Sequence, residues 1–296
     1  MTERALVVGW PSFVDGIASA GDVLGMEAAR EELTQAGLPC DMALSPVFRP
    51  EALRLEDAAP ARYTHLVFAC GPLHGQQVTS LHERYAHCRR VAVGVSVIDA
   101  DDPAAAGFHA ILARDRDDAE PQGDLALHPR HAPLPVAGVI LADTQPEYGA
   151  RSQGDQAGSD LIRWLQGCGC ALVPLDTRLD REDWRLAYRP AELEAVIRRL
   201  DLVVTTRLHG LVLALKNGVP AIAVDPVAGG AKVTAQAQAW GWPATMTMED
   251  LSQEVLGHWR DWCLSPTGKA SARCAAVSPP SSPLRDLLRA LGLERR

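Results

Sequence analysis

The residues best suited to chemistry lie together in one segment, DLVVTTRLHGLVLALKNGVPAIAVDPVAGGAK, residues 201–232. An apolar run ends at Thr205, Arg207 and His209 follow it directly, and we expect a helix to begin at Gly210. Ligands of open α/β sheets bind at the carboxyl ends of strands and at helix N-termini. A guanidinium at a helix N-terminus binds anions, and a neighbouring histidine exchanges protons near neutral pH. The segment therefore predicts an anion site with an acid–base residue.

The same spacing also has a purely structural interpretation. Arg207 can pair with an acidic side chain, and His209 can cap a turn without touching any ligand. Both interpretations stay open on spacing alone, because each uses the same residue types in the same order.

Several motifs in order along the chain resemble the polysaccharide pyruvyl transferase family. In that family, a strand is followed by the motif (S/T)RxHG, a helix, the motif GVP and a second strand. This sequence has TRLHG at 206–210 and GVP at 218–220, with Lys232 after the next loop. Residues 20–22, AGD, resemble the family's NxGD segment, and LVFACGPL at 66–73 stands where the family has an apolar strand and a Gly-rich turn. The resemblance spans roughly residues 4–245, and the RLHG block is its most specific part.

A third motif and three departures concern the first half of the chain. Arg114 and Asp115 after a short strand, with GDLAL at 123–127, resemble the family's xRDxxS…pDpal region. The departures are Ala20 in place of Asn, ACGP in place of the Gly-rich turn, and Asp117 and Asp118 where a Ser often follows. They lie in the half expected to bind the acceptor.

The resemblance implies an enzyme that moves a pyruvyl group from phosphoenolpyruvate onto a sugar or glycan acceptor, as a ketal. Carried over to this sequence, Arg207 binds the phosphate or carboxylate of the donor, and Lys232 is a second anion contact. His209 is the acid–base residue beside the enol, and Leu208 and Gly210 bring backbone groups close to the donor. The scheme requires no metal and no cofactor besides this donor substrate.

Two further residues are candidate substrate contacts in the first half. Asp22 stands at an expected helix start, where it can hold acceptor hydroxyls or simply act as the N-cap. Arg114 can contact a ligand, or it can pair with Asp115 or Asp117.

Two other functions remain open from the sequence. A GT-B glycosyltransferase with a nucleotide-sugar donor needs an acid that binds the ribose, for which Asp225 and Glu249 are candidates, although no E-x7-E pattern stands out. The second alternative is a non-catalytic family member that binds a glycan or a partner protein, and the altered motifs of the first half suggest it.

Apolar runs that alternate with amphipathic segments must position these residues, and they predict an α/β protein of two Rossmann-like domains facing a cleft, as in GT-B enzymes. We expect strands at 4–8, 41–44, 64–69, 90–97, 108–113, 139–142, 170–174, 202–205 and 219–224. We expect helices at 22–36, 76–88, 156–167, 190–200, 210–217, 233–240, 251–263 and 284–293, with a linker at 128–138 and a loose connection at 265–283. The domains are then 1–130 on the acceptor side, 131–283 on the phosphoenolpyruvate side, and a terminal helix at 284–296.

Composition excludes several classes of protein. Among 296 residues, 29 are Lys or Arg and 37 are Asp or Glu, so the net charge of −8 argues against a dedicated nucleic-acid binder. The sequence contains no run of eighteen or more apolar residues, so we expect no integral membrane segment, and the N-terminus does not resemble a signal peptide. Seven cysteines without framework spacing indicate reduced thiols. We therefore expect a cytoplasmic protein whose partners are a small-molecule donor and a glycan, with homo-oligomerisation left open.

Overall fold

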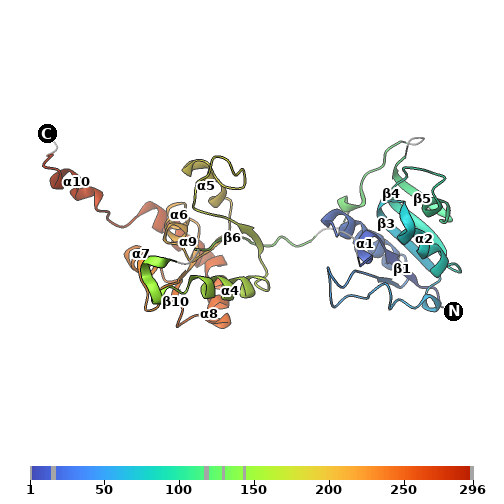
Figure 1. Cartoon of the computed structure of the whole chain (residues 1–296), viewed down its shortest axis with the longest axis horizontal. Helices are drawn as coiled ribbons and strands as arrows, with labels where there is room; N and C mark the ends of the chain where they lie inside the picture. The colour runs from blue at the N-terminus through green and yellow to red at the C-terminus, as the bar shows by residue number, and fades with distance from the viewer. Residues whose placement is uncertain (1, 15–17, 117–119, 129–130, 143–144, 294–296) are drawn as a thin grey trace. The chain divides into compact units, whose positions relative to one another are not determined.

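The chain divides into two compact units, Met1–His131 and Ala132–Arg296 (Figure 1). The structure is a computed structural model, and it describes residues 2–14, 18–116, 120–128, 131–142 and 145–293. Residue 130, where we expected the first domain to end, lies outside the described residues, as do Asp117, Asp118 and residues 294–296 of the terminal segment. Each unit is described by itself.

The first unit is built on a five-stranded parallel sheet in the order β2-β1-β3-β4-β5. Its strands β1 and β3 are apolar runs that become buried because helices cover the sheet, whereas the edge strands β2 and β5 have no fully buried residue. Their bounds are β1 Ala5–Val8, β2 Cys40–Met42, β3 His65–Pro72, β4 Arg89–Ser96 and β5 Ala110–Asp115.

Helices lie on both faces of this sheet. Alternate side chains of a strand point to opposite faces, and Val7 packs in one cluster with Met26 of α1, Ala20–Gln35. Leu6 packs in a second cluster with Val78 of α2, Gly75–Arg84. The remaining helical elements are η1 Trp10–Ser12, η2 Pro60–Arg62, α3 Pro103–Ala106 and η3 Leu125–Leu127.

The second unit repeats this layout. Its parallel sheet has the order β10-β9-β8-β6-β7. Numbered within the unit, both sheets have the doubly wound order 2-1-3-4-5. The bounds are β6 Val136–Ile140, β7 Ala171–Pro174, β8 Leu202–Thr205, β9 Ala221–Asp225 and β10 Thr245–Thr247, with helices η4 Pro146–Arg151, α4 Gly154–Leu165, α5 Pro190–Ile197, α6 Leu208–Lys216, α7 Lys232–Trp240, α8 Gln253–Leu264, α9 Pro266–Val277 and α10 Leu284–Ala290.

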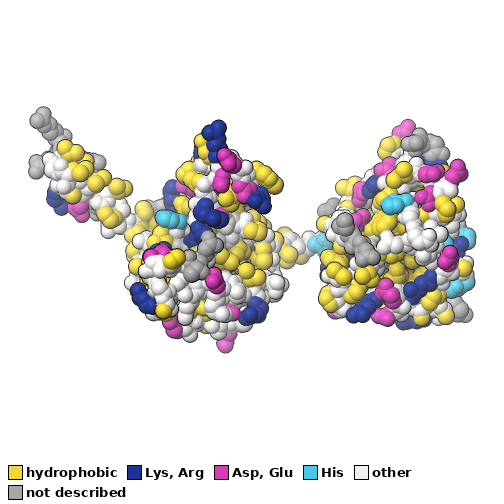
Figure 2. All heavy atoms as spheres, viewed as in Figure 1, with side chains coloured by type: hydrophobic (Ala, Val, Ile, Leu, Met, Phe, Trp, Pro, Cys, Tyr) yellow, Lys and Arg dark blue, Asp and Glu magenta, His cyan; other side chains and the backbone are white. Residues whose placement is uncertain are grey.

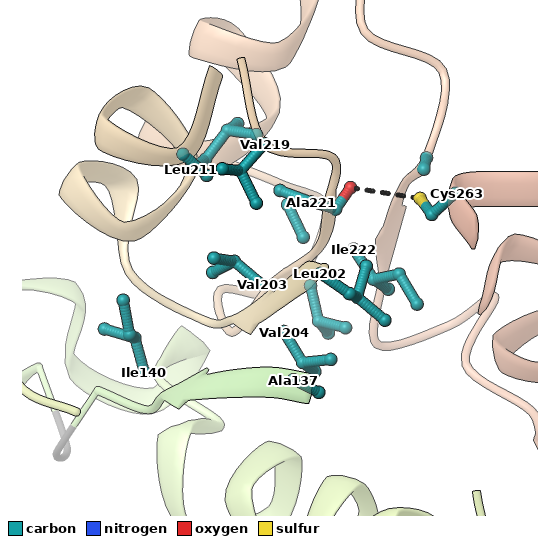
Figure 3. Packing of buried hydrophobic residues seen from close by; sticks show 14 of the residues in the cluster. Ala137, Ile140, Leu202, Val203, Val204, Leu211, Val219, Ala221, Ile222 and Cys263 are labelled. Carbon is teal, nitrogen blue, oxygen red and sulfur yellow. Dashed lines mark hydrogen bonds between the residues drawn. The ribbon is translucent and has the colours of Figure 1, made fainter. Parts of the chain in front are cut away.

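The core of the second unit forms around its central strands. Val203 and Val204 of β8 and Ile222 of β9 are fully buried, and Leu211 of α6 packs in the same cluster (Figure 3). From α8, the Cys263 thiol donates a hydrogen bond to the carbonyl oxygen of Ala221 at 3.8 Å. The two sheets with their helices confirm the prediction of two Rossmann-like α/β domains, while their arrangement around a cleft stays a prediction.

Several expected boundaries are wrong. The segment expected to be a loose connection contains α9, whose first residue Pro266 follows the N-cap Ser265. Asp22 is not the N-cap of α1, because Ser19 holds that position and its hydroxyl oxygen accepts the Asp22 amide at 3.1 Å. The expected linker ends early because β6 already begins at Val136.

Among the described helices, none is both long and apolar enough to cross a membrane. On the visible face of each unit, Lys and Arg side chains are interspersed with Asp and Glu (Figure 2). This mixture provides no continuous basic field on that face for a nucleic-acid backbone.

Candidate active site

The candidate site lies where the strand order of the second sheet reverses. β8 and β7 flank β6 on opposite sides, which makes the carboxyl ends of β6 and β8 the topological switch point, the place where such sheets bind ligands. Thr205 and Thr206 are fully buried there. The Thr205 hydroxyl donates to the Ile140 carbonyl oxygen at 2.9 Å, and the Ala142 amide donates to Thr206 Oγ1 at 2.6 Å. These bonds tie the two strand ends together just before Arg207.

Arg207 is the N-cap residue of α6, and its side chain is held on two sides. Nε donates to the Leu141 carbonyl oxygen at 2.7 Å, and one terminal nitrogen lies 3.3 Å from Asp176 Oδ1. Burial alone would raise the pKa of Asp176, but hydrogen bonds from Arg178 and the charge of Arg207 hold it below the ordinary value of 3.8. The pair therefore keeps the guanidinium in one orientation at the helix N-terminus.

His209 lies in the first turn of α6, because the helix begins at Leu208 and not at Gly210 as predicted. Its side chain is exposed. Gly210 is buried against the end of β8, where an added Cβ would lie 2.1 Å from Thr205 Oγ1. Only glycine permits this approach, which seats the first turn of α6 on the strand end and leaves His209 at the surface of the unit.

Lys232 begins α7, and Asp225 shapes the loop before it. The buried Asp225 carboxylate accepts the amides of Val227, Ala231 and Thr234 and the Thr234 hydroxyl, at 2.7–3.1 Å. Lys232 Nζ lies 3.4 Å from Glu147 Oε1 and 5.5 Å from the centre of the Tyr148 ring. Because Asp225 is occupied by these four bonds, it does not serve as a ribose-binding acid.

These side chains converge on one cavity of about 300 Å³. That volume is at the lower end of the usual range for small-molecule sites, about 300–1,000 Å³. The predicted residues Arg207, Leu208, His209 and Lys232 all line it, and the full lining is Ala142, Gln145, Thr177, Arg207, Leu208, His209 and Lys232. Two cations, an imidazole and the N-terminus of α6 are groups that can bind a small anion.

A comparison with protein-family models matches residues 170–226 to the family described as polysaccharide pyruvyl transferase. The family resemblance is confirmed over this segment. The polysaccharide pyruvyl transferase match runs from the start of β7 to the end of β9 and contains the TRLHG motif. Lys232 and the whole first unit lie outside the matched residues. A comparison with curated proteins finds no match.

Solved structures similar to this chain include glycosyltransferases and UDP-GlcNAc 2-epimerases. MurG of Acinetobacter baumannii is 12% identical, over 98% of this chain and 99% of that chain, with a TM-score of 0.35. CalG4, the calicheamicin glycosyltransferase, is 12% identical, over 99% and 98%, with a TM-score of 0.34. The UDP-GlcNAc 2-epimerase of Methanocaldococcus jannaschii is 9% identical, over 93% and 99%, with a TM-score of 0.32. Scores this low carry no argument, so the fold class rests on the two sheets.

Sequence reasoning missed two polar residues that line the cavity, Thr177 and Gln145. Thr177 follows β7, and Gln145 follows β6. Both stand beyond the carboxyl ends of strands, so the rule that selected Arg207 applies to them as well. They were passed over because neutral side chains give no charge signal. Among the described residues, no group of three or more metal-binding side chains is present.

The structure places Asp22 and Arg114 in the first unit, and neither lines this cavity. Asp22 lies in the first turn of α1, where its carboxylate accepts the Ser19 hydroxyl at 2.6 Å. Arg114 donates to Asp124 and to Ser96 Oγ, and the hydrogen bond to Asp124 is the main reason that the Arg114 pKa is raised. These contacts give both residues a structural role.

The first unit also has a larger cavity, of about 640 Å³, bordered by α1 and strands β3, β4 and β5. Its lining is mostly apolar and includes Val67, Val91, Val93 and Leu112. None of the residues predicted for catalysis or substrate binding lines it.

Proposed function

We propose that this protein is a transferase that moves the pyruvyl group of phosphoenolpyruvate to hydroxyls of a sugar or glycan. The observation that carries the proposal is the convergence of Arg207, His209 and Lys232 on one cavity at the switch point of the second sheet. The family match over residues 170–226 supports the same reaction class.

In this proposal, Arg207 and Lys232 bind the phosphate of the donor and stabilise it as it leaves. His209 delivers a proton to C3 of the enol while an acceptor hydroxyl forms a bond to C2. The C2–O bond to phosphate then breaks, the phosphate leaves with the proton of the first acceptor hydroxyl, and a second acceptor hydroxyl attacks C2 to close the ketal. His209, neutral after its first step, accepts the proton released on closure. The products are the ketal and inorganic phosphate.

Three variants test the assignment of these roles. Arg207→Ala should weaken phosphoenolpyruvate binding by about 10-fold or more, because a hydrogen-bonded charge contact contributes about 1.5–3 kcal/mol. His209→Ala should bind the donor but lose phosphate release. Lys216→Ala is the matched control, since Lys216 ends the same helix and pairs with Glu194 outside the cavity. Calorimetry with phosphoenolpyruvate measures binding, and phosphate release with methyl glycosides of common hexoses measures transfer.

Two outcomes contradict the proposal. Stabilisation of the protein by nucleotide sugars without any by phosphoenolpyruvate would favour the glycosyltransferase alternative. Unchanged turnover in His209→Ala would remove the imidazole from the mechanism.

A further inference from the structure

The first sheet has a switch point of its own, to which the proposed reaction assigns no role. β2 and β3 flank β1 on opposite sides, so the carboxyl ends of β1 and β3 correspond to those of β6 and β8 in the second unit. Ligands of doubly wound sheets bind at this position. Trp10 follows the end of β1, and His74 follows the end of β3. An indole and an imidazole therefore stand where a ligand of this unit would bind.

The rings of Trp10 and His74 form one stacked pair. Their centres lie 5.0 Å apart, and their planes are inclined by 32°. Trp10 Nε1 donates a hydrogen bond to the Pro72 carbonyl oxygen at 3.1 Å, which fixes the indole against the end of β3. His74 is exposed while Trp10 is half-buried, so the imidazole is the ring that a ligand can reach. Neither nitrogen of this imidazole has a hydrogen-bond partner among the described residues.

Strained backbone supports the pair. Cys70 and Gly71 at the end of β3 both have left-handed φ angles, of +66° and +74°, and Cys70 is the one non-glycine residue with a positive φ in the described part of the chain. Such a conformation costs about 1–3 kcal/mol in a residue with a side chain, and it is concentrated at ligand-binding sites. A Cβ on Gly71 would lie 2.2 Å from Trp10 Cδ1. The strained turn therefore makes room for the indole under the imidazole.

The charges near this strand end distinguish between classes of ligand. Burial first, and then the charges of Asp124 and Asp22, raise the pKa of the Cys70 thiol to about 12. The charge of Arg114 acts in the opposite direction, but its guanidinium is already bound to Asp124. The surplus of negative charge disfavours a phosphate or a nucleotide and favours a neutral ligand.

A sugar ring has the chemistry that the stacked pair can bind. The face of an aromatic ring carries partial negative charge, and the C–H groups on the face of a pyranose are weakly positive, so the two surfaces pack flat. The ring nitrogens of a histidine donate and accept hydrogen bonds, as sugar hydroxyls also do. An aromatic surface with a few polar groups at a switch point is typical of a small-molecule site.

We propose that the stacked pair binds a sugar ring of the glycan acceptor, with His74 in contact with the sugar and Trp10 holding the imidazole in place. This inference rests on the proposed function, which requires a sugar or glycan acceptor. It makes His74 a specificity-determining residue for the acceptor and Trp10 a positioning residue.

Nuclear magnetic resonance of the full chain, labelled with ¹³C in its histidine side chains, tests the inference. The imidazole signal that is missing in His74→Ala belongs to His74, and methyl glycosides of common hexoses should shift it. The matched control is His87→Ala, because His87 is also exposed in the first unit but precedes β4 at the opposite edge of the sheet. Saturation transfer to the glycosides should fall with an affinity about 10-fold weaker in His74→Ala and should persist in His87→Ala.

Trp10→Leu tests the positioning role. Loss of the indole should move the His74 signal in the absence of any ligand, because the ring no longer shields the imidazole, and should weaken glycoside binding as His74→Ala does. Calorimetry should find phosphoenolpyruvate affinity within about twofold of the unmodified protein in all three variants. Thermal unfolding verifies that each variant is folded.

Three results would overturn the inference: no shift of the His74 signal by any glycoside, a shift by inorganic phosphate alone, or equal saturation transfer in His74→Ala and the unmodified protein. An unmoved His74 signal in Trp10→Leu would refute the role of the indole. Each of these leaves the proposed function standing as long as phosphoenolpyruvate binds. Absence of phosphoenolpyruvate binding by the unmodified protein would refute the proposed function whatever the glycosides do, so the two failures are distinguishable.

Discussion

Arg207 and Lys232 both lie beside a carboxylate, but they are held to different degrees. The side chains of Arg207 and Asp176 are 19% and 16% exposed, whereas those of Lys232 and Glu147 are 39% and 57% exposed. An exposed pair is weak and exchanges partners easily, while a partly buried one keeps its geometry. Arg207 is therefore oriented before an anion arrives, and Lys232 can leave Glu147 to join it.

Tyr63 in the first unit links stability to pH. It is fully buried, and its hydroxyl donates to Asp41 Oδ2 at 2.9 Å. Burial, followed by the bond to Asp41, raises the pKa of Tyr63 from 10.0 to about 12. A raised pKa means that the folded state favours the neutral phenol, so its contribution is complete below pH 10 and is lost as the pH rises towards 12.

We expect the unmodified protein to lose up to about 2 kcal/mol of unfolding free energy through this group above pH 10. Tyr63→Phe should be less stable at pH 8, since it lacks the bond to Asp41, and should show a shallower alkaline decline. Denaturant unfolding between pH 8 and 11.5 measures both effects. The control is Tyr188→Phe, at a residue that is 52% exposed, and it should keep the original slope. Equal slopes for all three proteins would contradict the assignment.

At the scale of elements, the N-terminus of α6 depends on its contact with β8. In Gly210→Ala, the new methyl group would meet Thr205 Oγ1 at 2.1 Å and Thr205 Cβ at 2.8 Å. Forcing a methyl group into such a contact costs about 1–3 kcal/mol. We also expect a lower turnover, because displacement of the helix start moves His209.

The control for Gly210→Ala is Gly257→Ala within α8, where no atom lies within 4 Å of the added Cβ. This second substitution should stabilise the protein by about 0.5–1 kcal/mol, since alanine is the better helix residue. Denaturant midpoints compare the two variants. Equal midpoints for Gly210→Ala and the unmodified protein would show that the close contact is absent.

The elements also show what the sequence can and cannot predict. Buried strands such as β8, Leu202–Thr205, are continuous apolar runs and were predicted to the residue. Helix α9 was missed because its sequence, PTGKASARCAAV, consists mainly of small residues and reads as a linker. Those small residues permit close packing: a Cβ on Gly268 would lie 2.2 Å from the Trp262 carbonyl oxygen. Such packing depends on the neighbouring helix and leaves no strong apolar period in the sequence.

The candidate site was predictable in its charged and titratable members and in Leu208, which the family resemblance supplied. Arg207 and His209 follow a strand end and carry charge or titrate, so pattern and chemistry select them together, whereas Lys232 was predicted from the family resemblance. Asp225 is the last residue of β9, yet its carboxylate is used entirely by the loop that follows. Gln145 also follows a strand, but its neutral side chain gives no charge signal, and only the coordinates show that it lines the cavity.

At the scale of the whole molecule, each unit has its own core and its own sheet. All residues of the large buried cluster around β8 and β9 lie in the second unit, and so do all residues that line the candidate site. A unit with a complete core is expected to fold alone. We therefore expect a fragment of residues 132–296 to unfold cooperatively and to bind phosphoenolpyruvate within about threefold of the full chain, a difference of less than 0.7 kcal/mol.

Circular dichroism during heating and calorimetry on this fragment measure the two properties. The fragment with Arg207→Ala is the control, and it should fold while losing donor affinity. A fragment that folds but binds phosphoenolpyruvate far more weakly than the full chain would show that the first unit contributes to the donor site. A fragment that binds the donor normally while the full chain alone transfers pyruvate to methyl glycosides would assign acceptor binding to the first unit, because the donor chemistry is already complete in the second.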